Sequence, residues 1–293
     1  MRAIGIDVSL VRRLDVVALA DSGRVVFGPI KAAVTDIPAI LREVNPDVVA
    51  IDSPPQWGTV GKSRLIEKQL RKVGINIYSC PTDPGNHPFY AWLRAGFKAF
   101  DAATGEGFRL YRGGPMKPRQ SIEVFPHASA VVLRGSLAPV GVAKSVWRRA
   151  VLEAAGIDSS DMRTIDHLDA ALAALTGLKF LTGDFSVVGT PGEAVLVLPI
   201  GGRPTKRYAR DQRAATSRRL GPHAARRPLV DETGHACGCG CGAPARRRYL
   251  PGHDAKHKSR LLAAMRGGSA SAADELQQLG WGRMSAVADN LLP

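Results

Sequence analysis

The sequence predicts an α/β protein in which helices flank a mixed β-sheet, with a small basic region attached at its C-terminal end. Three observations support this fold class. Over residues 1–202, short apolar segments alternate with segments of helical periodicity. Several of the apolar segments end in a carboxylate. The basic residues are concentrated further on, because residues 203–266 carry 16 Lys and Arg against 4 Asp and Glu.

The N-terminal part is expected to contain three strands, a short helix and a fourth strand. The second and third strands flank an Asp-Ser-Gly turn, which predicts a hairpin. The helix has apolar residues on one face, and the fourth strand is continuously apolar, as in the interior of a sheet. In chain order these elements occupy residues 2–7, 14–20, 24–30, 36–44 and 48–51.

The rest of the core is expected to alternate helices with strands, giving the order β-β-β-α-β-α-β-α with one added helix. An insertion rich in Pro, Gly and aromatic residues is expected to cover the site, with a helix inside it. Ser63 is the expected cap of the helix that precedes this insertion. The expected elements are helix 63–73, insertion 80–119 with helix 89–104, strand 120–125, helices at about 144–155 and 165–182, and strand 194–198.

Five acidic residues form the candidate catalytic site. Carboxylates that close neighbouring strands gather at one edge of a sheet, where like charges raise one another's pKa unless a cation lies among them. Hard oxygen ligands select Mg²⁺ or Mn²⁺, and two such ions can clamp the attacking and leaving oxygens of a phosphoryl transfer. The candidates are Asp7, Asp52, Glu123, Asp166 and Asp169.

Each acid also has a structural interpretation. Asp7 and Asp52 follow strands, where Asp commonly stabilises turns. Asp166 and Asp169 lie on one face at the start of a helix, where acids cap the helix or complement its dipole, and Asp166 is the expected N-cap. Glu123 is least easily explained in this way, because a charge inside an apolar strand is costly unless it is paired or metal-bound.

Taken in order, these segments resemble the family catalogued as domain of unknown function 429, predicted ribonuclease H-like nucleases. The resemblance covers roughly residues 1–200 and implies a ribonuclease H-like fold and a two-metal nuclease site. The late helix is also similar to that of RuvC-type junction resolvases, where both acids approach the metals. The segments that carry the resemblance are Ile4–Asp7, Val49–Pro54, Arg64 with Gln69–Arg71, Ile122–His127 and Asp166–Ala174.

The resemblance implies that Asp7, Asp52, Glu123 and Asp169 hold two Mg²⁺ or Mn²⁺ ions, with Asp166 assisting. Basic residues near the acids are expected to approach the scissile phosphate or its strand. His127 is a candidate hydrogen-bond donor to a phosphate or a candidate proton shuttle, with an ordinary loop histidine as the alternative. The other expected substrate contacts in the core are Lys62, Arg64 and Arg71.

The cysteines of the basic region suggest a zinc site. Cys237, Cys239 and Cys241 lie too close together to staple a fold, and with His253 they provide the four soft ligands of a tetrahedral Zn²⁺. Their alternating spacing departs from the usual two-residue gap, so a redox-sensitive or flexible Gly/Cys loop stays open. The three arginines that follow, Arg246, Arg247 and Arg248, are expected to contact nucleic acid.

The shift in composition predicts a core domain at residues 1–202, a basic linker at 203–234, a zinc-binding module at 235–266 and a tail at 267–293. A net charge of +14 makes a polyanion the natural partner, while a solvated basic linker is the structural alternative. No apolar run approaches the ~20 residues of a membrane span, and no signal pattern is present. We therefore expect a cytoplasmic protein without membrane contact.

The leading functional hypothesis is a metal-dependent nuclease acting on DNA or RNA. A catalytically inactive, nucleic-acid-binding adaptor with the same fold is the alternative. An actin-like ATPase is less consistent with the sequence, because the Gly-rich phosphate loops of that fold are missing. The sequence leaves open whether the chain forms a homodimer.

Overall fold

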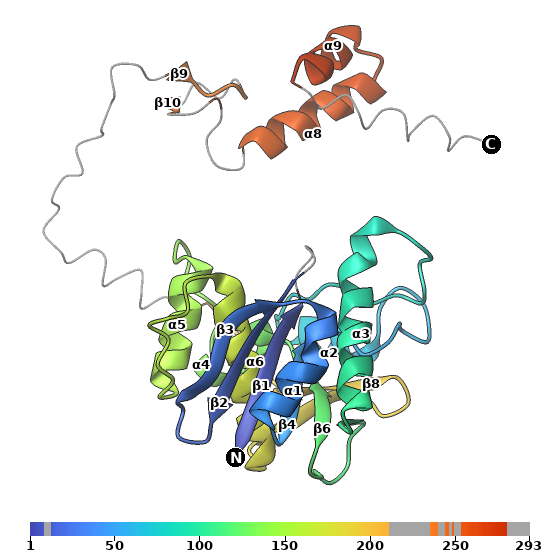
Figure 1. Cartoon of the computed structure of the whole chain (residues 1–293). Helices are drawn as coiled ribbons and strands as arrows, with labels where there is room; N and C mark the ends of the chain where they lie inside the picture. Colours follow the sequence, from blue (N-terminus) through green and yellow to red (C-terminus); the bar gives the residue numbers. More distant parts are fainter. Residues whose placement is uncertain (9–12, 211–234, 240–243, 246–247, 249–252, 280–293) are drawn as a thin grey trace, which may run out of the picture. The chain divides into compact units, whose positions relative to one another are not determined.

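The computed structural model describes residues 1–8, 13–210, 235–239, 244–245, 248 and 253–279 (Figure 1). Its contacts divide the chain into two units. We call Met1–Leu220 the core unit and Gly221–Pro293 the tail unit.

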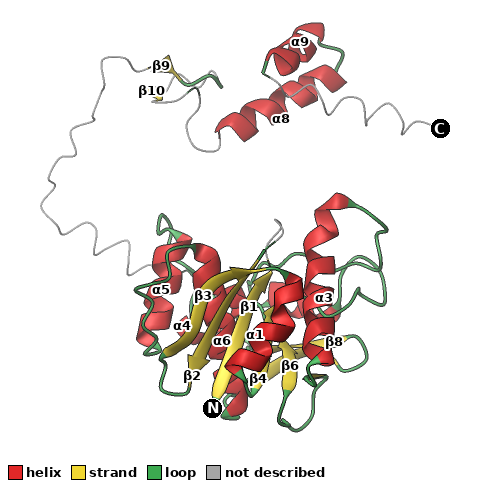
Figure 2. Ribbon diagram, viewed as in Figure 1, coloured by secondary structure: helices red, strands yellow, loops and turns green. Residues whose placement is uncertain are grey.

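One mixed sheet of eight strands runs through the described residues of the core unit (Figure 2). Its strands are β1 (Arg2–Val8), β2 (Leu14–Ala20), β3 (Val25–Ala32), β4 (Val48–Asp52), β5 (Arg109–Leu110), β6 (Gln120–Glu123), β7 (Ser186–Thr190) and β8 (Ala194–Leu198). The order is β3-β2-β1-β4-β6-β8-β7, and β5 pairs with β6. β1 to β3 are antiparallel neighbours, β4, β6 and β8 run parallel to β1, and β7 is antiparallel to β8. This is the ribonuclease H-like architecture that the sequence predicted.

Helices cover both faces of this sheet (Figure 1). Their bounds are α1 (Ile37–Val44), α2 (Leu65–Lys72), α3 (Ala91–Gly105), α4 (Pro126–Arg134), α5 (Lys144–Ala154) and α6 (Ile165–Leu181), with short 3-10 helices at Val34–Asp36 and Pro88–Tyr90. α6 packs on β1, β2 and β4 with α4 and α5 beside it, α1 and α3 cover the opposite face, and α2 packs on β7 and β8. Within the described residues, none of the helices combines the length and apolar character needed to cross a membrane.

The pleat of the strands sends alternate side chains into two separate cores. In β1, Ala3 packs into the core beneath α6, whereas Ile4 and Ile6 pack beneath α1 and α3. Because successive side chains point to opposite faces, Gly5 and Asp7 share the α6 face with Ala3. The last residue of this row, Asp7, therefore faces the start of α6.

Two glycines allow α6 to lie directly on the sheet. A Cβ atom on Gly5 would lie 2.0 Å from the carbonyl oxygen of Ala170. A Cβ atom on Gly177 would lie 2.9 Å from the Cβ of Ala3. Any side chain at Gly5 would force the helix away, so this close approach fixes the height of α6 above β1.

Several elements differ from the sequence expectation. α4 was not expected, because Pro126 was interpreted as a strand end, whereas Pro at the first helical position favours helix initiation. β7 was missed as well. α2 begins at Leu65 with Arg64 as its N-cap, so Ser63 is not the cap. The chain also stays on the core beyond residue 202, since the Tyr208 amide donates to the Val73 carbonyl at 2.9 Å.

The described residues of the tail unit contain a two-stranded ribbon and two helices. β9 (His235–Ala236) pairs antiparallel with β10 (Pro244–Ala245), and α8 (His253–Arg266) is followed by α9 (Ala270–Gln278). The two helices pack through Leu261, Ala272 and Leu276. α9 lies within residues 267–293, the segment that was expected to be a tail.

Candidate metal centre

Three aspartates stand side by side on adjacent strands. Asp7 of β1 is the register partner of Asp15 on β2 and of Asp52 on β4. Asp7 and Asp52 each follow by two residues, and Asp15 precedes by two residues, a position in contact with α6 or in the core beneath it, so all three belong to the same face of the sheet. The alignment explains how acids from three strands reach one place.

The first turn of α6 adds two more acids above this row. Thr164 is the N-cap of the helix, and its hydroxyl accepts a hydrogen bond from the His167 amide at 3.1 Å. Asp166, which the sequence assigned to the cap, is therefore inside the first turn. One carboxylate oxygen each of Asp7, Asp15 and Asp166 lies within 4.8 Å of the others, a spacing that suits a metal ion. We call Asp7, Asp15, Asp52, Asp166 and Asp169 the carboxylate cluster.

The electrostatics of the cluster show a surplus of negative charge. Burial, followed by the charges of Asp169 and Asp166, raises the pKa of Asp7 to about 8. Burial and the neighbouring Asp7 raise the pKa of Asp52 well above its ordinary value, and the two side chains share a hydrogen bond. Without a cation, Asp7 holds its proton to neutral pH. A divalent ion among them would favour the ionised forms.

Three basic side chains bind the outer members of the cluster. Lys31 Nζ lies 2.8 Å from Asp15 Oδ2, and His167 Nε2 lies 3.3 Å from Asp15 Oδ1. On the other side, Arg148 Nε donates to Asp169 Oδ1 at 2.6 Å. These contacts orient Asp15 and Asp169, whereas burial and the neighbouring carboxylates raise the pKa values of Asp7 and Asp52.

His127 lies behind Arg148 and not in the carboxylate cluster. Its Nδ1 is 3.2 Å from Arg148 Nη1. Burial, Arg148 and Lys144 lower the pKa of His127 to about 4, so the ring is neutral at physiological pH. The structure therefore places His127 against Arg148, the residue that orients Asp169, and the His127 ring accepts a hydrogen bond from the Arg148 guanidinium.

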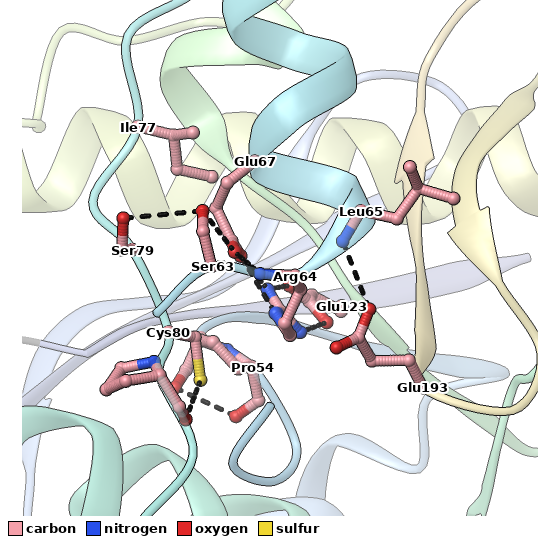
Figure 3. Close-up of polar contacts among 12 residues, drawn as sticks. Pro54, Ser63, Arg64, Leu65, Glu67, Ile77, Ser79, Cys80, Glu123 and Glu193 are labelled. Carbon is pink, nitrogen blue, oxygen red and sulfur yellow. Dashed lines mark hydrogen bonds and ion pairs between the residues drawn. The ribbon is translucent and has the colours of Figure 1, made fainter. Parts of the chain in front are cut away.

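Glu123 points to the other face of the sheet. In the register of β4 and β6 it is aligned with Ile51, which lies in the core beneath α1 and α3, and not with Asp52. Its two oxygens accept hydrogen bonds from Arg64 Nη1 at 2.9 Å and Nη2 at 2.6 Å (Figure 3). The expected metal ligand is thus engaged in a bidentate ion pair.

Arg64 is the centre of a second buried group, which we call the arginine cluster: Arg64, Glu67 and Glu123. Besides Glu123, Arg64 binds Glu67 through Nε at 2.8 Å, and its side chain is only 1% exposed (Figure 3). The sequence suggested that Arg64 approaches a phosphate. In the structure its guanidinium is occupied by two carboxylates, so its contacts are those of an internal counter-ion.

The remaining expected substrate contacts of the core lie near α2. Arg71 binds the loop after the helix, donating to the Ile77 carbonyl at 2.8 Å and to Ser79 Oγ at 2.7 Å. Lys62 is exposed before the helix. Glu193 accepts from the Leu65 amide at 3.1 Å, where a negative charge complements the start of the helix (Figure 3).

A cavity of about 350 Å³ connects the two clusters. Its lining includes Asp7, Asp52 and Asp166 from the carboxylate cluster and all three members of the arginine cluster. The remaining wall comes from the segment after α2 and the start of α3, including Tyr78, Phe89 and Trp92. Both groups of buried charge therefore border one space at the carboxyl ends of β1 and β4, a common location for sites in α/β proteins.

Sequence reasoning missed Asp15, Lys31 and Arg148. Asp15 lies inside an apolar strand and is fully buried, so the argument that singled out Glu123 applies to it equally. The hairpin supplied the further signal, because antiparallel pairing of the first two strands brings Asp15 opposite Asp7. Lys31 and Arg148 are fixed only by tertiary contacts.

The expected zinc ligands are only partly within the described residues. The Sγ atoms of Cys237 and Cys239 are 3.5 Å apart, and both side chains are buried. The Gly238 amide between them donates to the Arg248 carbonyl at 2.7 Å. Cys241, the side chain of His253, and the arginines Arg246 and Arg247 lie outside the described residues.

The sheet order and the facing acids define a protein of ribonuclease H-like class. The chain belongs to the family described as "Protein of unknown function (DUF429)", which matches residues 5–194. The chain is similar to the solved Thermus thermophilus RuvC structure, with 18% identity and a TM-score of 0.34, over 64% of this chain and 99% of that one. No curated protein matches the sequence.

Proposed function

We propose that the protein is a metal-dependent nuclease that hydrolyses phosphodiester bonds of DNA or RNA. The observation that carries the proposal is the convergence of five buried or half-buried aspartates from β1, β2, β4 and α6, three of which line a cavity. Packing alone gives no reason to collect such charge, since it raises the pKa of Asp7 to about 8. A group of hard oxygen donors whose negative charges repel one another is suited to Mg²⁺ or Mn²⁺.

In this proposal Asp7 is the central ligand, because it borders both neighbouring strands and α6. Asp52 and Asp169 complete one side and Asp15 and Asp166 the other, so two ions have shared and separate donors. Two bound ions would supply an activated water and stabilise the leaving 3′ oxygen. Glu123 differs from the sequence expectation here, because Arg64 occupies both of its oxygens.

The other residues orient the donors. Arg148 holds Asp169 and is itself bonded to neutral His127, so the carboxylate keeps one rotamer. Lys31 and His167 do the same for Asp15. Ligands fixed in this way need little rearrangement when an ion enters, which favours tight and specific coordination.

The decisive experiment is cleavage of labelled single-stranded and duplex DNA and RNA by the full chain. Activity is expected with Mg²⁺ or Mn²⁺, none with EDTA, and none in the Asp52→Asn variant under any of these conditions. Mn²⁺ binding to the same proteins, followed by electron paramagnetic resonance, is expected to fall in the variant. Metal and nucleic-acid binding without cleavage would instead support the inactive adaptor.

The tail unit is proposed to add non-specific affinity for nucleic acid and to hold one structural Zn²⁺. Buried, adjacent Cys237 and Cys239 suit thiolate ligation, with Cys241 and His253 as the remaining donors. Purified protein should carry close to one Zn²⁺, which the double substitution Cys237→Ser and Cys239→Ser should release.

Removal of residues 221–293 should weaken nucleic-acid binding and flatten its salt dependence, because fewer counterions are released.

A further inference from the structure

Three aromatic side chains beside the carboxylate cluster have no role in the function proposed so far. Tyr78 is 70% exposed and Phe89 is 47% exposed, although both line the cavity that reaches Asp7 and Asp52. Trp92, from the first turn of α3, lines the same wall. We call Tyr78, Phe89 and Trp92 the aromatic corner.

The rings of the aromatic corner are inclined to one another and not stacked. The centroids of Tyr78 and Phe89 are 6.1 Å apart with planes at 72°, and those of Tyr78 and Trp92 are 6.4 Å apart at 62°. Inclined rings of this kind leave at least one ring face without an internal partner in the group. A planar guest can stack on one ring while its edge meets another.

The backbone that carries Tyr78 is held firmly. Arg71 donates from one nitrogen to the Ile77 carbonyl and to Ser79 Oγ, so the residues on both sides of Tyr78 are bound by the same guanidinium. Phe89 lies in the 3-10 helix that leads into α3, and Phe89 also packs edge-on against Tyr90 at 5.0 Å. The exposure of the two rings is therefore built into the fold.

The position of the corner determines what it can bind. The cavity of about 350 Å³ has the aromatic corner on one wall and Asp7, Asp52 and Asp166 on another. This size falls in the range of small-molecule pockets, about 300–1,000 Å³. A substrate whose phosphate reaches the carboxylates therefore places its neighbouring chemical groups against the rings. In nucleic acid those groups are sugars and bases.

We propose that the aromatic corner stacks an unpaired nucleobase next to the scissile phosphate, so that the substrate is single-stranded or locally unpaired nucleic acid. The inference rests on the proposed nuclease function and specifies its substrate class. Bases in a duplex already stack on their neighbours, and only an unpaired base can offer its face to protein aromatics. Exposed rings in a fixed frame beside a phosphate-binding site match this requirement.

The test compares single-stranded and duplex binding in the full chain. Asp52→Asn serves as the non-cleaving background, and the probes are a fluorescein-labelled single strand without self-complementarity and the blunt-ended duplex that it forms with its complement. Adding Tyr78→Ala and Phe89→Ala should weaken single-strand binding by roughly tenfold or more and leave duplex binding little changed. Tyr78→Phe with Phe89→Tyr should keep the affinity, as should Val140→Ala, which alters a hydrophobic side chain that is 78% exposed and does not line the cavity.

Equal losses for single strand and duplex, or no loss for either, would overturn the inference while leaving the nuclease proposal intact. Failure of the background protein to bind any nucleic acid would remove both. Photocrosslinking provides a measurement that does not depend on the folding of the alanine variants. A single strand containing 5-iodouracil should crosslink to Tyr78, Phe89 or Trp92, and crosslinks confined to other residues would contradict the proposal.

Discussion

The carboxylate cluster and the arginine cluster border the same cavity but balance charge in opposite ways. In the arginine cluster one guanidinium binds both Glu67 and Glu123, so each buried acid has a cation in direct contact. In the carboxylate cluster the central Asp7 has acids on both neighbouring strands, and its pKa rises to about 8. The difference indicates that internal pairing stabilises one group, whereas the other is left for an external cation.

The largest effect that separates the two clusters should be on cleavage. Asp7→Asn and Asp52→Asn should each lower metal-dependent cleavage by roughly 10³-fold or more, because each removes a central donor. Both variants should melt at the same temperature as the wild type or higher in EDTA, since the substitution relieves repulsion. Calorimetry and cleavage rates check this, with exposed Asp101→Asn as the control. Full activity in both variants would contradict the catalytic assignment, and loss of folding would support the turn interpretation.

In the arginine cluster, removing the central side chain should lower the stability of the fold. Arg64→Met leaves Glu67 and Glu123 buried without their cation and should lower the free energy of unfolding by about 3–5 kcal/mol. Urea denaturation measures the loss. Arg71→Met, which removes a half-buried cation on the same helix, should cost less. A stable Arg64→Met protein with impaired substrate binding alone would restore Arg64 as a substrate contact.

The pH dependence of stability sharpens the contrast further. The pKa of Asp7 is raised from 3.8 to about 8, so the metal-free folded state binds this proton more tightly than the unfolded state. Stability should therefore fall as pH rises from about 4 to about 8, and Mg²⁺ or Mn²⁺ should restore it at the upper end. Melting temperatures in EDTA should show a wild-type deficit relative to Asp7→Asn that grows with pH. A deficit that shrinks with pH would reverse the assigned sign.

The smallest effect is expected at Arg148, the cation that pairs with Asp169 at the edge of the carboxylate cluster. Arg148→Gln removes the cation that holds Asp169 and should weaken Mn²⁺ binding severalfold and slow cleavage, because Asp169 loses its fixed rotamer. Titration with Mn²⁺ and cleavage rates measure the two effects. Arg149→Gln, one position along α5, is the matched control for metal binding. Unchanged metal affinity in Arg148→Gln would remove Arg148 from the centre.

Local sequence pattern was sufficient for much of the fold and for part of the centre. Apolar strands ending in Asp7 and Asp52, and two acids three residues apart at the start of a helix, are signals carried by neighbouring residues. They predicted the ribonuclease H-like order of elements. They also led to the grouping of acids from separate segments, although the roles proposed for these residues await the experiments above.

The contacts that decide the role of Glu123 and Arg64 are not local. These residues are 59 positions apart, and their pairing depends on the fold bringing the N-cap of α2 to the last residue of β6. A shift of one residue along the strand would turn Glu123 to the opposite face of the sheet, since its neighbour Val124 belongs to the core beneath α6. Charge alone therefore suggested a metal ligand and a phosphate contact where the fold forms an ion pair.

The contact of Gly5 with the backbone of α6 has a consequence for how this fold can diversify. Because main-chain atoms of α6 meet Gly5 directly, the spacing between β1 and the helix is set within these two elements. The aromatic segment at residues 77–92 can then be exchanged or lengthened without disturbing that spacing. Under the proposed function, relatives that differ in this segment are expected to keep the carboxylate cluster and to differ in the nucleic acid that they bind.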